Sequence, residues 1–323
     1  MNFVRFFGFI LSMLLLFGFQ ATPVKQVAIF DFDDRTPFPD ALSMHIEERI
    51  RALSEGIAVS HYSGKSDEIY STDVLSTLDN RGLDLLIIRT SDALIIAQHT
   101  LFKTPTLYTN VNNPKILGFR TLGPPGGNIS GASYYIPIKK HISLYKILQP
   151  ALKRPGFVFD KNNQSRKAEV PEAREACAEL GLGFDAEFID KKVQLREMVQ
   201  MLVSRGADAI VVATSGLLYE NIDHFLDITD NAGIPVYSFY KAGVRKGAVA
   251  AMSSDYFQMV DELLIPMAKQ VLFHKISPGD MPVAFQKNSK VFINERQAKN
   301  LHIEIPEKII MEDSEVIVEL SMQ

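Results

Sequence analysis

The sequence predicts an α/β protein in which two similar halves each form a parallel β-sheet covered by helices. Short apolar runs alternate with longer segments whose apolar residues recur at helical spacing, which is typical of strands joined by crossover helices. This rhythm occurs twice, on either side of the glycine- and proline-rich segment 123–127. Each half is too short for a barrel of eight strand–helix units.

The first half begins with a buried strand over residues 26–30, followed by a helix over 41–54. Leu42, Ile46 and Ile50 lie on one face of this helix, and Gly56 follows at a position where glycine commonly ends a helix. The remaining predicted elements of this half are strands over 57–60, 83–88 and 106–108 and helices over 67–80 and 93–100.

The same alternation restarts beyond segment 123–127. Helices are predicted over residues 145–152, 169–180, 193–205 and 222–231. Strands are predicted over residues 157–159, 187–189, 208–213 and 235–239. The second half therefore repeats the plan of the first.

The composition excludes several classes of protein. The 323 residues are 46% hydrophobic, which suits about two globular domains and excludes a disordered chain. A net charge of -4 lacks the basic excess typical of nucleic-acid binders. Cys177 is the single cysteine, so no disulfide framework or multi-thiolate metal site is expected. The seven histidines show no zinc-binding spacing, and we expect no metal or cofactor.

Residues 1–21 have the pattern of a secretory signal. Arg5 precedes an apolar run over 6–17, and Ala21 suits the position before a cleavage site. Phe19 is large for the position two residues before the cut, so an uncleaved membrane anchor is the alternative. Either reading places the remainder of the chain outside the cytoplasm.

Polar side chains gather where the predicted strands of both halves end. Ligands of open parallel sheets bind outside the carboxyl ends of the strands. The residues at these ends are 31–35, Thr90, Ser91 and 110–113 in the first half, and 160–165, Thr214, Ser215, Tyr240 and Lys241 in the second. Each of the Asp, Ser, Thr and Asn residues could instead cap the helix that follows it. Their clustering in both halves favours a small polar ligand held between two lobes.

One motif offers an enzymatic alternative. Asp31 and Asp33 follow a hydrophobic strand in the order that resembles the nucleophile loop of haloacid-dehalogenase-type phosphatases, which are magnesium-dependent. Arg35 stands where those enzymes carry Thr or Val, and the late acidic cluster 312–315 lies outside the predicted sheets. The glycine-rich segment does not match a phosphate-binding loop or a nucleophile elbow. The sequence therefore favours a protein that is not an enzyme.

An ordered set of motifs extends from residue 127 onward. The first motif is Gly127-Asn128-Ile129-Ser130-Gly131-Ala132-Ser133. The others are Gly233-Ile234-Pro235-Val236-Tyr237, Lys246-Gly247-Ala248-Val249-Ala250-Ala251, Asp255-Tyr256, Val291-Phe292-Ile293-Asn294, Ala298-Lys299-Asn300-Leu301 and Ile305-Pro306-Glu307. In this order the set resembles the ABC-transporter substrate-binding proteins of the tryptophan/tyrosine type, a family of type I periplasmic binding proteins.

The resemblance implies two Rossmann-like lobes hinged by three crossovers. The N-terminal lobe would comprise residues 22–140 completed by about 256–283, and the C-terminal lobe residues 141–255 completed by about 284–323. By position, the ligand-binding residues would be Asp33, Thr90, Ser91, Asn110, Asn112, Asn128, Asp160, Thr214, Ser215, Tyr240 and Asp255. Asp160 or Asp33 would pair with the ammonium group of an amino-acid ligand, since a buried unpaired cation is very costly.

The function that these features predict is capture of a small organic solute. The resemblance implies an exported, periplasmic protein, expected to be a monomer, that delivers an aromatic or other amino acid to an ABC permease in the inner membrane. Two alternatives stay open: the phosphatase built on Asp31 and Asp33, and a ligand-sensing domain for a membrane signalling partner.

Overall fold

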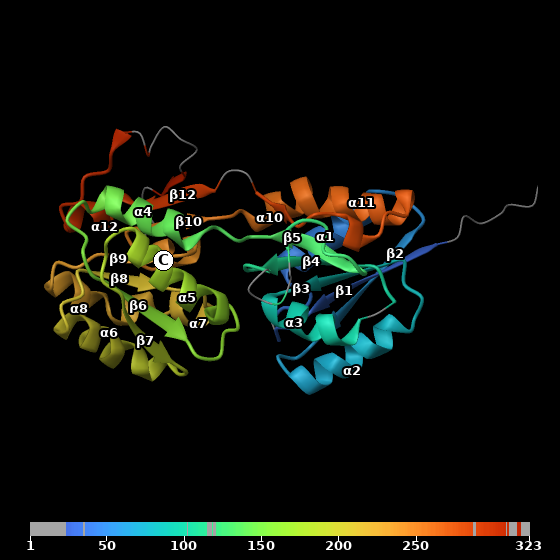
Figure 1. Ribbon diagram of the computed structural model, residues 1–323, viewed down its shortest axis with the longest axis horizontal. Helices are drawn as coiled ribbons and strands as arrows, with labels where there is room; N and C mark the ends of the chain where they lie inside the picture. Colours follow the sequence, from blue (N-terminus) through green and yellow to red (C-terminus); the bar gives the residue numbers. More distant parts are fainter. Residues whose placement is uncertain are drawn as a thin grey trace, which may run out of the picture.

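The computed structural model describes residues 24–34, 36–101, 103–114, 118, 121–286, 289–307, 309 and 315–317. The predicted signal over residues 1–21 lies outside these residues. Two α/β lobes lie side by side, and the chain passes between them more than once (Figure 1). No helix in the described part of the chain has the length and apolar character needed to span a membrane.

The first lobe contains a parallel sheet of six strands in the order β11-β5-β4-β3-β1-β2. Its strands are β1 (Lys25–Asp31), β2 (Ile57–Ser63), β3 (Leu85–Arg89), β4 (Thr106–Val111), β5 (Ile129–Ser133) and β11 (Ala284–Phe285). Strands β1, β3 and β4 are buried along most of their length, which explains the apolar runs of β1 and β3, whereas β4 also buries Thr106, Thr109 and Asn110.

Helices cover both faces of this sheet. On one face α1 (Ala41–Arg51) packs with α11 (Ile265–His274), and on the other α2 (Glu68–Asp79) packs with α3 (Ser91–Thr100) (Figure 1). The return from the second lobe is a single-turn helix α10 (Tyr256–Met259) that runs through a π-helical turn η3 (Val260–Leu264) into α11. Residues far apart in sequence therefore complete the first lobe.

The second lobe contains a mixed sheet of seven strands in the order β13-β12-β10-β9-β8-β6-β7, with β12 antiparallel to β10. Its strands are β6 (Pro155–Asp160), β7 (Asp185–Ile189), β8 (Ala209–Val212), β9 (Val236–Ser238), β10 (Ala250–Ser253), β12 (Lys290–Asn294) and β13 (Glu315–Ile317). Its α-helices are α4 (Ile138–Leu148), α5 (Arg166–Glu179), α6 (Leu195–Ser204), α7 (Gly216–Tyr219), α8 (Leu226–Asn231), α9 (Lys241–Arg245) and α12 (Glu295–Asn300). Short 3₁₀ turns are η1 (Lys192–Gln194) and η2 (Ile222–His224) in this lobe and η4 (Pro278–Asp280) in the first.

The two sheets repeat one topology. The order β2-β1-β3-β4-β5 of the first lobe corresponds to β7-β6-β8-β9-β10 of the second. In such doubly wound sheets the order reverses beside the first strand, which here places switch points between β1 and β3 and between β6 and β8. The carboxyl ends of these strands are therefore the places where a ligand is expected to bind.

Three crossovers join the lobes, as the resemblance implies. They lie between β5 and α4, between β10 and α10, and between β11 and β12. Neighbouring crossovers are hydrogen-bonded to each other: Ser254 Oγ donates to Tyr134 O at 3.1 Å, and Asp255 N donates to Gln286 Oε1 at 3.1 Å. The three connections consequently form one hinge.

The α/β fold with two repeated halves is confirmed, and the differences have physical reasons. Strand β5 was not predicted, because its sequence Ile-Ser-Gly-Ala-Ser has little strand propensity and is held by its neighbours in the sheet. Helix α4 begins at Ile138 rather than at 145, and the helix expected over 222–231 is divided into η2 and α8. Strand β11 lies in the first sheet, so the chain returns to the second lobe later than residue 284.

Gly131 provides a test of the packing of β5 against β4. A Cβ at this position would lie 2.6 Å from Tyr108 N and still closer to Tyr108 O, and backbone atoms cannot move aside as a flexible side chain can. We therefore expect Gly131→Ala to lower the free energy of unfolding by about 1–3 kcal/mol, the usual cost of overpacking. Gly216→Ala is the control, because a Cβ there meets no atom within 4 Å. Equal urea denaturation midpoints for the two variants would contradict this account.

Candidate functional site

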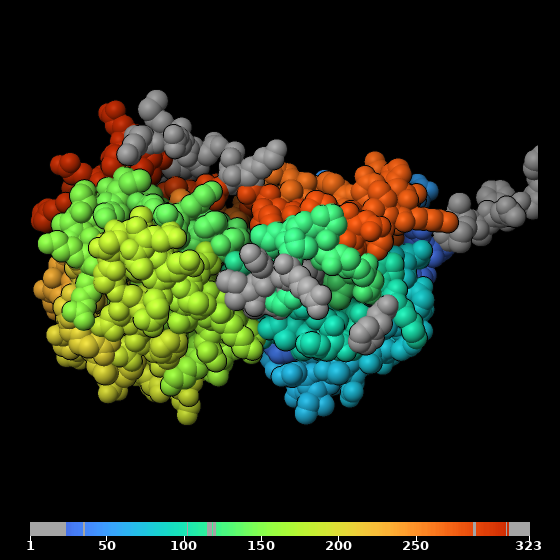
Figure 2. Space-filling view, in the orientation of Figure 1, coloured from blue at the N-terminus to red at the C-terminus, as the bar shows by residue number. Residues whose placement is uncertain are grey.

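A cleft of about 660 Å³ lies between the lobes at the carboxyl ends of the two sheets. Figure 2 shows the lobes in contact, with a notch between their lower parts. Seven residues that the sequence assigns to the site line this cleft: Asp33, Thr90, Ser91, Asn110, Thr214, Ser215 and Tyr240. The arrangement follows from the topology, because the strand ends of each lobe point toward the other lobe.

The amino-terminal end of α3 faces the cleft with a strained backbone. Thr90 caps the helix by accepting a hydrogen bond from Ala93 N, yet its φ is +85°, a region that side-chain-bearing residues rarely adopt. Asn110 at the end of β4 also has a positive φ, of +56°. Such strain concentrates at functional sites, where the surrounding structure compensates for it. The helix end supplies N–H groups and a dipole that favour an anionic group.

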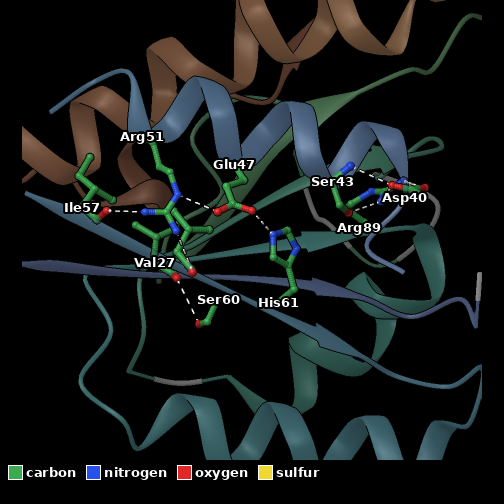
Figure 3. Close-up of polar contacts among 10 residues, drawn as sticks. Val27, Asp40, Ser43, Glu47, Arg51, Ile57, Ser60, His61 and Arg89 are labelled. Atoms are coloured by element: carbon green, nitrogen blue, oxygen red, sulfur yellow. Dashed lines mark hydrogen bonds and ion pairs between the residues drawn. The ribbon is translucent and has the colours of Figure 1, made fainter. Parts of the chain in front are cut away.

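Arg89 fixes the floor of the cleft in the first lobe. Its side chain is 0% exposed, and Nη1 lies 2.6 Å from both Asp31 Oδ2 and Asp40 Oδ1. The guanidinium also donates to the hydroxyl of Ser43, and Figure 3 shows Arg89 beside Asp40 and Ser43 at the start of α1. Through Asp31 and these two residues, Arg89 joins the ends of β1 and β3 to the start of α1. Asp31 is thus buried in an ion pair with Arg89, whereas the phosphatase alternative needs its carboxylate to face a substrate.

Four tyrosines form a continuous cluster in the cleft wall. The tyrosine cluster consists of Tyr134, Tyr219, Tyr240 and Tyr256, and all four line the cleft. Tyr240 and Tyr256 are stacked with ring centroids 5.2 Å apart, while Tyr134 lies 5.6 Å from Tyr256 and Tyr219 lies 5.5 Å from Tyr240. Burial raises the pKa of Tyr134 and Tyr219, so both hydroxyls stay neutral. The cluster offers an aromatic surface with polar edges.

Glu169 joins the two lobes at the inner end of the cleft. The residue lies on α5 of the second lobe and is 3% exposed. Its Oε1 accepts a hydrogen bond of 2.9 Å from Asn112 Nδ2 of the first lobe, and its Oε2 accepts one of 3.2 Å from Thr214 N. Burial raises the pKa of Glu169 to about 7, although the hydrogen bonds from Thr214 and Asn112 lower it.

A small cavity of about 30 Å³ lies behind the tyrosine cluster, and we call it the hinge cavity. Its lining includes Glu169, Asn112, Thr214 and His141, together with the four tyrosines. His141 is buried, and burial lowers the pKa of its imidazole to about 3, so the ring is neutral. The Nδ1 atom of His141 has no hydrogen-bond partner within the described part of the chain.

The carboxylates on the outer side of the cleft have other partners or neighbours. Asp160 accepts hydrogen bonds from Ser215 Oγ at 2.7 Å and from Asn162 N at 2.8 Å. Asp160 and Asp33 line an adjoining pocket of about 570 Å³. Burial, and then the charge of Asp33, raise the pKa of Asp92 in the same pocket to about 6.

Three expected site residues are not among those lining the cleft or the hinge cavity: Asp160, which lines only the adjoining pocket, Asn128 and Asp255. Asn128 precedes β5, at the amino end of the sheet, and its Nδ2 donates to Thr104 O at 2.8 Å. Asp255 caps α10 by accepting hydrogen bonds from Phe257 N and Gln258 N. For the latter two residues the motif is structural: Asn128 ties a loop to a strand, and Asp255 begins a helix.

The sequence analysis missed Glu169, Arg89 and three members of the tyrosine cluster. Glu169 stands in a helix with charged neighbours, where a glutamate usually faces solvent. Arg89 ends a strand whose other residues are all apolar, and a buried arginine at a strand end was a signal for ion pairing with the acidic residues after β1. Tyr134 lies in the first crossover and Tyr256 begins the single-turn helix α10 after the second, and sequence periodicity describes neither place.

Comparison with known proteins identifies similar sequences and folds. Residues 57–317 match a family model described as ABC transporter substrate binding protein. A tyrosine-binding protein from Clostridioides difficile is 24% identical over 263 residues, covering 80% of this chain and 74% of that protein.

Two solved structures share the fold over nearly the whole chain. An ABC domain from Streptococcus pneumoniae in complex with L-Trp aligns with a TM-score of 0.77 and 22% identity, covering 91% of this chain and 99% of that one. A ligand-free, open structure of a substrate-binding protein with adhesive properties from Clostridium difficile aligns with a TM-score of 0.73 and 24% identity. The alignment covers 91% of this chain and 99% of that one.

The ion pairs of Arg89 predict a large effect on stability. Replacing Arg89 with methionine leaves Asp31 and Asp40 without their buried guanidinium partner. We expect Arg89→Met to lower the free energy of unfolding by about 3–5 kcal/mol in urea denaturation. Arg196→Met is the control, since Arg196 makes a comparable double contact with Asp227 at the exposed surface. If Arg89→Met lowers the free energy of unfolding no more than Arg196→Met does, the stabilising role assigned to the buried ion pairs of Arg89 is contradicted.

The raised pKa of Glu169 predicts the direction of a pH effect on the unliganded protein. The folded state holds the Glu169 proton up to about pH 7, whereas the ordinary pKa of a glutamate side chain is 4.5. Stability from this group is therefore present below about pH 4.5 and is lost as pH rises to about 7. In urea denaturation, the free energy of unfolding of the wild type should fall by on the order of 3 kcal/mol between about pH 4.5 and pH 8, compared with that of Glu169→Gln. A difference in free energy of unfolding between wild type and Glu169→Gln that stays constant with pH would contradict the raised pKa of Glu169.

Proposed function

The chain belongs to the family of ABC transporter substrate-binding proteins, and we propose that its substrate is an L-amino acid with an aromatic side chain, bound in the cleft between the lobes. As a member of this family the chain is a binding protein and not an enzyme. The observation that carries the proposal is the tyrosine cluster in the cleft, beside the amino-terminal end of α3.

The tyrosine cluster supports an aromatic side chain on the ligand. Aromatic rings prefer to contact one another in stacked or edge-to-face arrangements, which contribute beyond the burial of area. Tyr240 and Tyr256 already form a parallel stack, so a further ring would extend an existing arrangement. The hydroxyl groups at the ring edges suit a ligand that carries a phenol hydroxyl or an indole N–H.

The amino-terminal end of α3 supports a carboxylate on the ligand. Ser91 and Thr90 line the cleft there, with a hydroxyl group on each side chain. Backbone N–H groups and the helix dipole together favour an anion at such a position. Arg89 is not required for this contact, because its guanidinium is already paired with Asp31 and Asp40.

The relatives support the same class of ligand. The relative from Clostridioides difficile is named a tyrosine-binding protein, and the similar structure from Streptococcus pneumoniae was solved in complex with L-Trp. Both ligands combine an α-amino acid with an aromatic ring, which is the combination that the cleft lining favours.

The same proposal includes how the substrate is delivered. We place the protein outside the cytoplasm, exported by the segment over residues 1–21, where it acts as a monomer. Closure of the two lobes about the three crossovers would enclose the substrate, and the closed form would present it to an ABC permease in the inner membrane.

Ligand fluorescence provides the test. The chain contains no tryptophan, so the indole emission of added L-tryptophan reports the ligand alone. We expect L-tryptophan and L-tyrosine to bind and to raise the melting temperature, while L-alanine and L-glutamate do neither. No change in emission or in melting temperature with either aromatic amino acid would contradict the proposal.

Removal of one ring from the cluster should weaken binding. Tyr256→Ala removes an aromatic face of the cleft, and we expect roughly tenfold lower affinity for L-tryptophan, equivalent to about 1.4 kcal/mol. Tyr70→Ala is the matched control, because Tyr70 is exposed on α2 and contacts Lys65 rather than the cleft. Equal affinities of the two variants would show that the cluster does not contact the ligand.

A further inference from the structure

Glu169 is a buried carboxylate without a cation. Its hydrogen-bond donors are neutral: the Asn112 side chain, the Thr214 backbone N–H and the Thr214 hydroxyl. Among the residues that the structure describes, it forms no ion pair with lysine or arginine. The negative charge of Glu172, on the same helix, raises the pKa of Glu169 further. A buried charge is costly unless an opposite charge accompanies it.

The Asn112 side chain is oriented so that it donates a hydrogen bond to Glu169 and does not accept one from it. Asn112 Oδ1 accepts a hydrogen bond of 2.7 Å from Asn113 N, so its Nδ2 is the atom that faces Glu169. An ionised carboxylate has about four lone-pair positions. With one bond from Asn112 and two from Thr214, Glu169 keeps a position at which it can accept a hydrogen bond from a cationic donor.

The hinge cavity gives such a donor a place beside Glu169. Five residues line both this cavity and the cleft: Tyr134, Thr214, Tyr219, Tyr240 and Tyr256. A volume of about 30 Å³ is enough for a group the size of one water molecule, which an ammonium group matches. The buried and unpartnered Nδ1 of His141 lies in the same lining, and in the neutral ring it can act as a second acceptor.

The other carboxylates near the cleft suit this role less well. Asp40 and Asp31 are paired with Arg89, and Asp160 accepts hydrogen bonds from Ser215 and Asn162. Asp33 and Asp92 line the cleft and the adjoining pocket, but neither lines the hinge cavity. Glu220 is exposed to solvent.

We propose that Glu169 is the counter-charge for the ammonium group of the bound amino acid, an inference that rests on the proposed function. The carboxylate position at α3 and the ammonium position at Glu169 are connected through one residue. Asn112 N donates to Ser91 Oγ at 3.2 Å, and the Asn112 side chain donates to Glu169. The α-carboxylate and α-ammonium of one amino acid are attached to the same carbon, so two such neighbouring positions match them.

Pairs of ligands with and without the ammonium group test this assignment. Indole-3-propionate keeps the ring and the carboxylate of L-tryptophan but lacks the ammonium group. We expect Glu169→Gln to weaken L-tryptophan binding by about 30-fold or more while leaving indole-3-propionate binding within about threefold. Glu172→Gln is the matched control, since Glu172 lies one turn further along α5 and accepts from Tyr135 Oη and Ile138 N. Equal losses for both ligands, or no loss for L-tryptophan, would overturn the proposal.

Proton release by the unmodified protein is an independent readout. An ammonium partner lowers the pKa of Glu169, so binding near pH 7 expels the protons that Glu169 carries in the free protein. The other titratable groups facing the site are Tyr134, Tyr219, Glu172 and His141, and Asp92 lies further out. Calorimetry in two buffers of different ionisation enthalpy should detect about half a proton released per L-tryptophan near pH 7, and none with indole-3-propionate.

The outcomes separate this inference from the proposed function. Proton release that persists in Glu169→Gln would assign it to another group and overturn the role of Glu169. Failure of both L-tryptophan and L-tyrosine to bind the unmodified protein would instead contradict the proposed function, and the inference would fall with it. Binding of L-tryptophan that is insensitive to Glu169→Gln would leave the proposed function intact and remove this residue from it.

Discussion

One hydrogen bond, from Asn112 Nδ2 to Glu169 Oε1, connects the two lobes at the inner end of the cleft. The rest of the site is arranged around it. On the side of the first lobe, Asn112 follows β4 and also contacts Ser91 at the start of α3. On the side of the second lobe, Glu169 contacts Thr214 at the end of β8. A polar bond in a buried hinge is strong because little water competes for it, and it costs much if one partner is lost.

The repeated topology explains why the site lies where it does. Each sheet has its switch point beside its first strand, and the two carboxyl edges face each other across the cleft. The first lobe contributes a helix end and the buried Arg89 cluster, which fixes the ends of β1, β3 and α1 relative to one another. The first crossover contributes Tyr134 and the start of α10, directly after the second crossover, contributes Tyr256, so any movement of the hinge also moves part of the cleft wall.

Sequence reasoning reached the fold and most of the strand-end residues because both follow from local patterns. Alternating strands and helices define the sheets, and residues such as Thr90, Ser91, Thr214 and Ser215 occupy the strand ends that this topology exposes. It failed where tertiary packing overrides local signals. Strand β5 is made of small residues, Asn128 lies at the wrong end of its strand, and Glu169 has the sequence context of an exposed helical residue. Only the meeting of α5 with the end of β4 reveals that this carboxylate is buried.

A crystal structure of the protein with bound L-tryptophan tests the central claim most directly. The account predicts that the ammonium nitrogen lies about 2.7–3.2 Å from an oxygen of Glu169, with the indole ring against the tyrosine cluster and the carboxylate at the start of α3. An ammonium group paired instead with Asp33 or Asp160, with no ligand atom against Glu169, would contradict it.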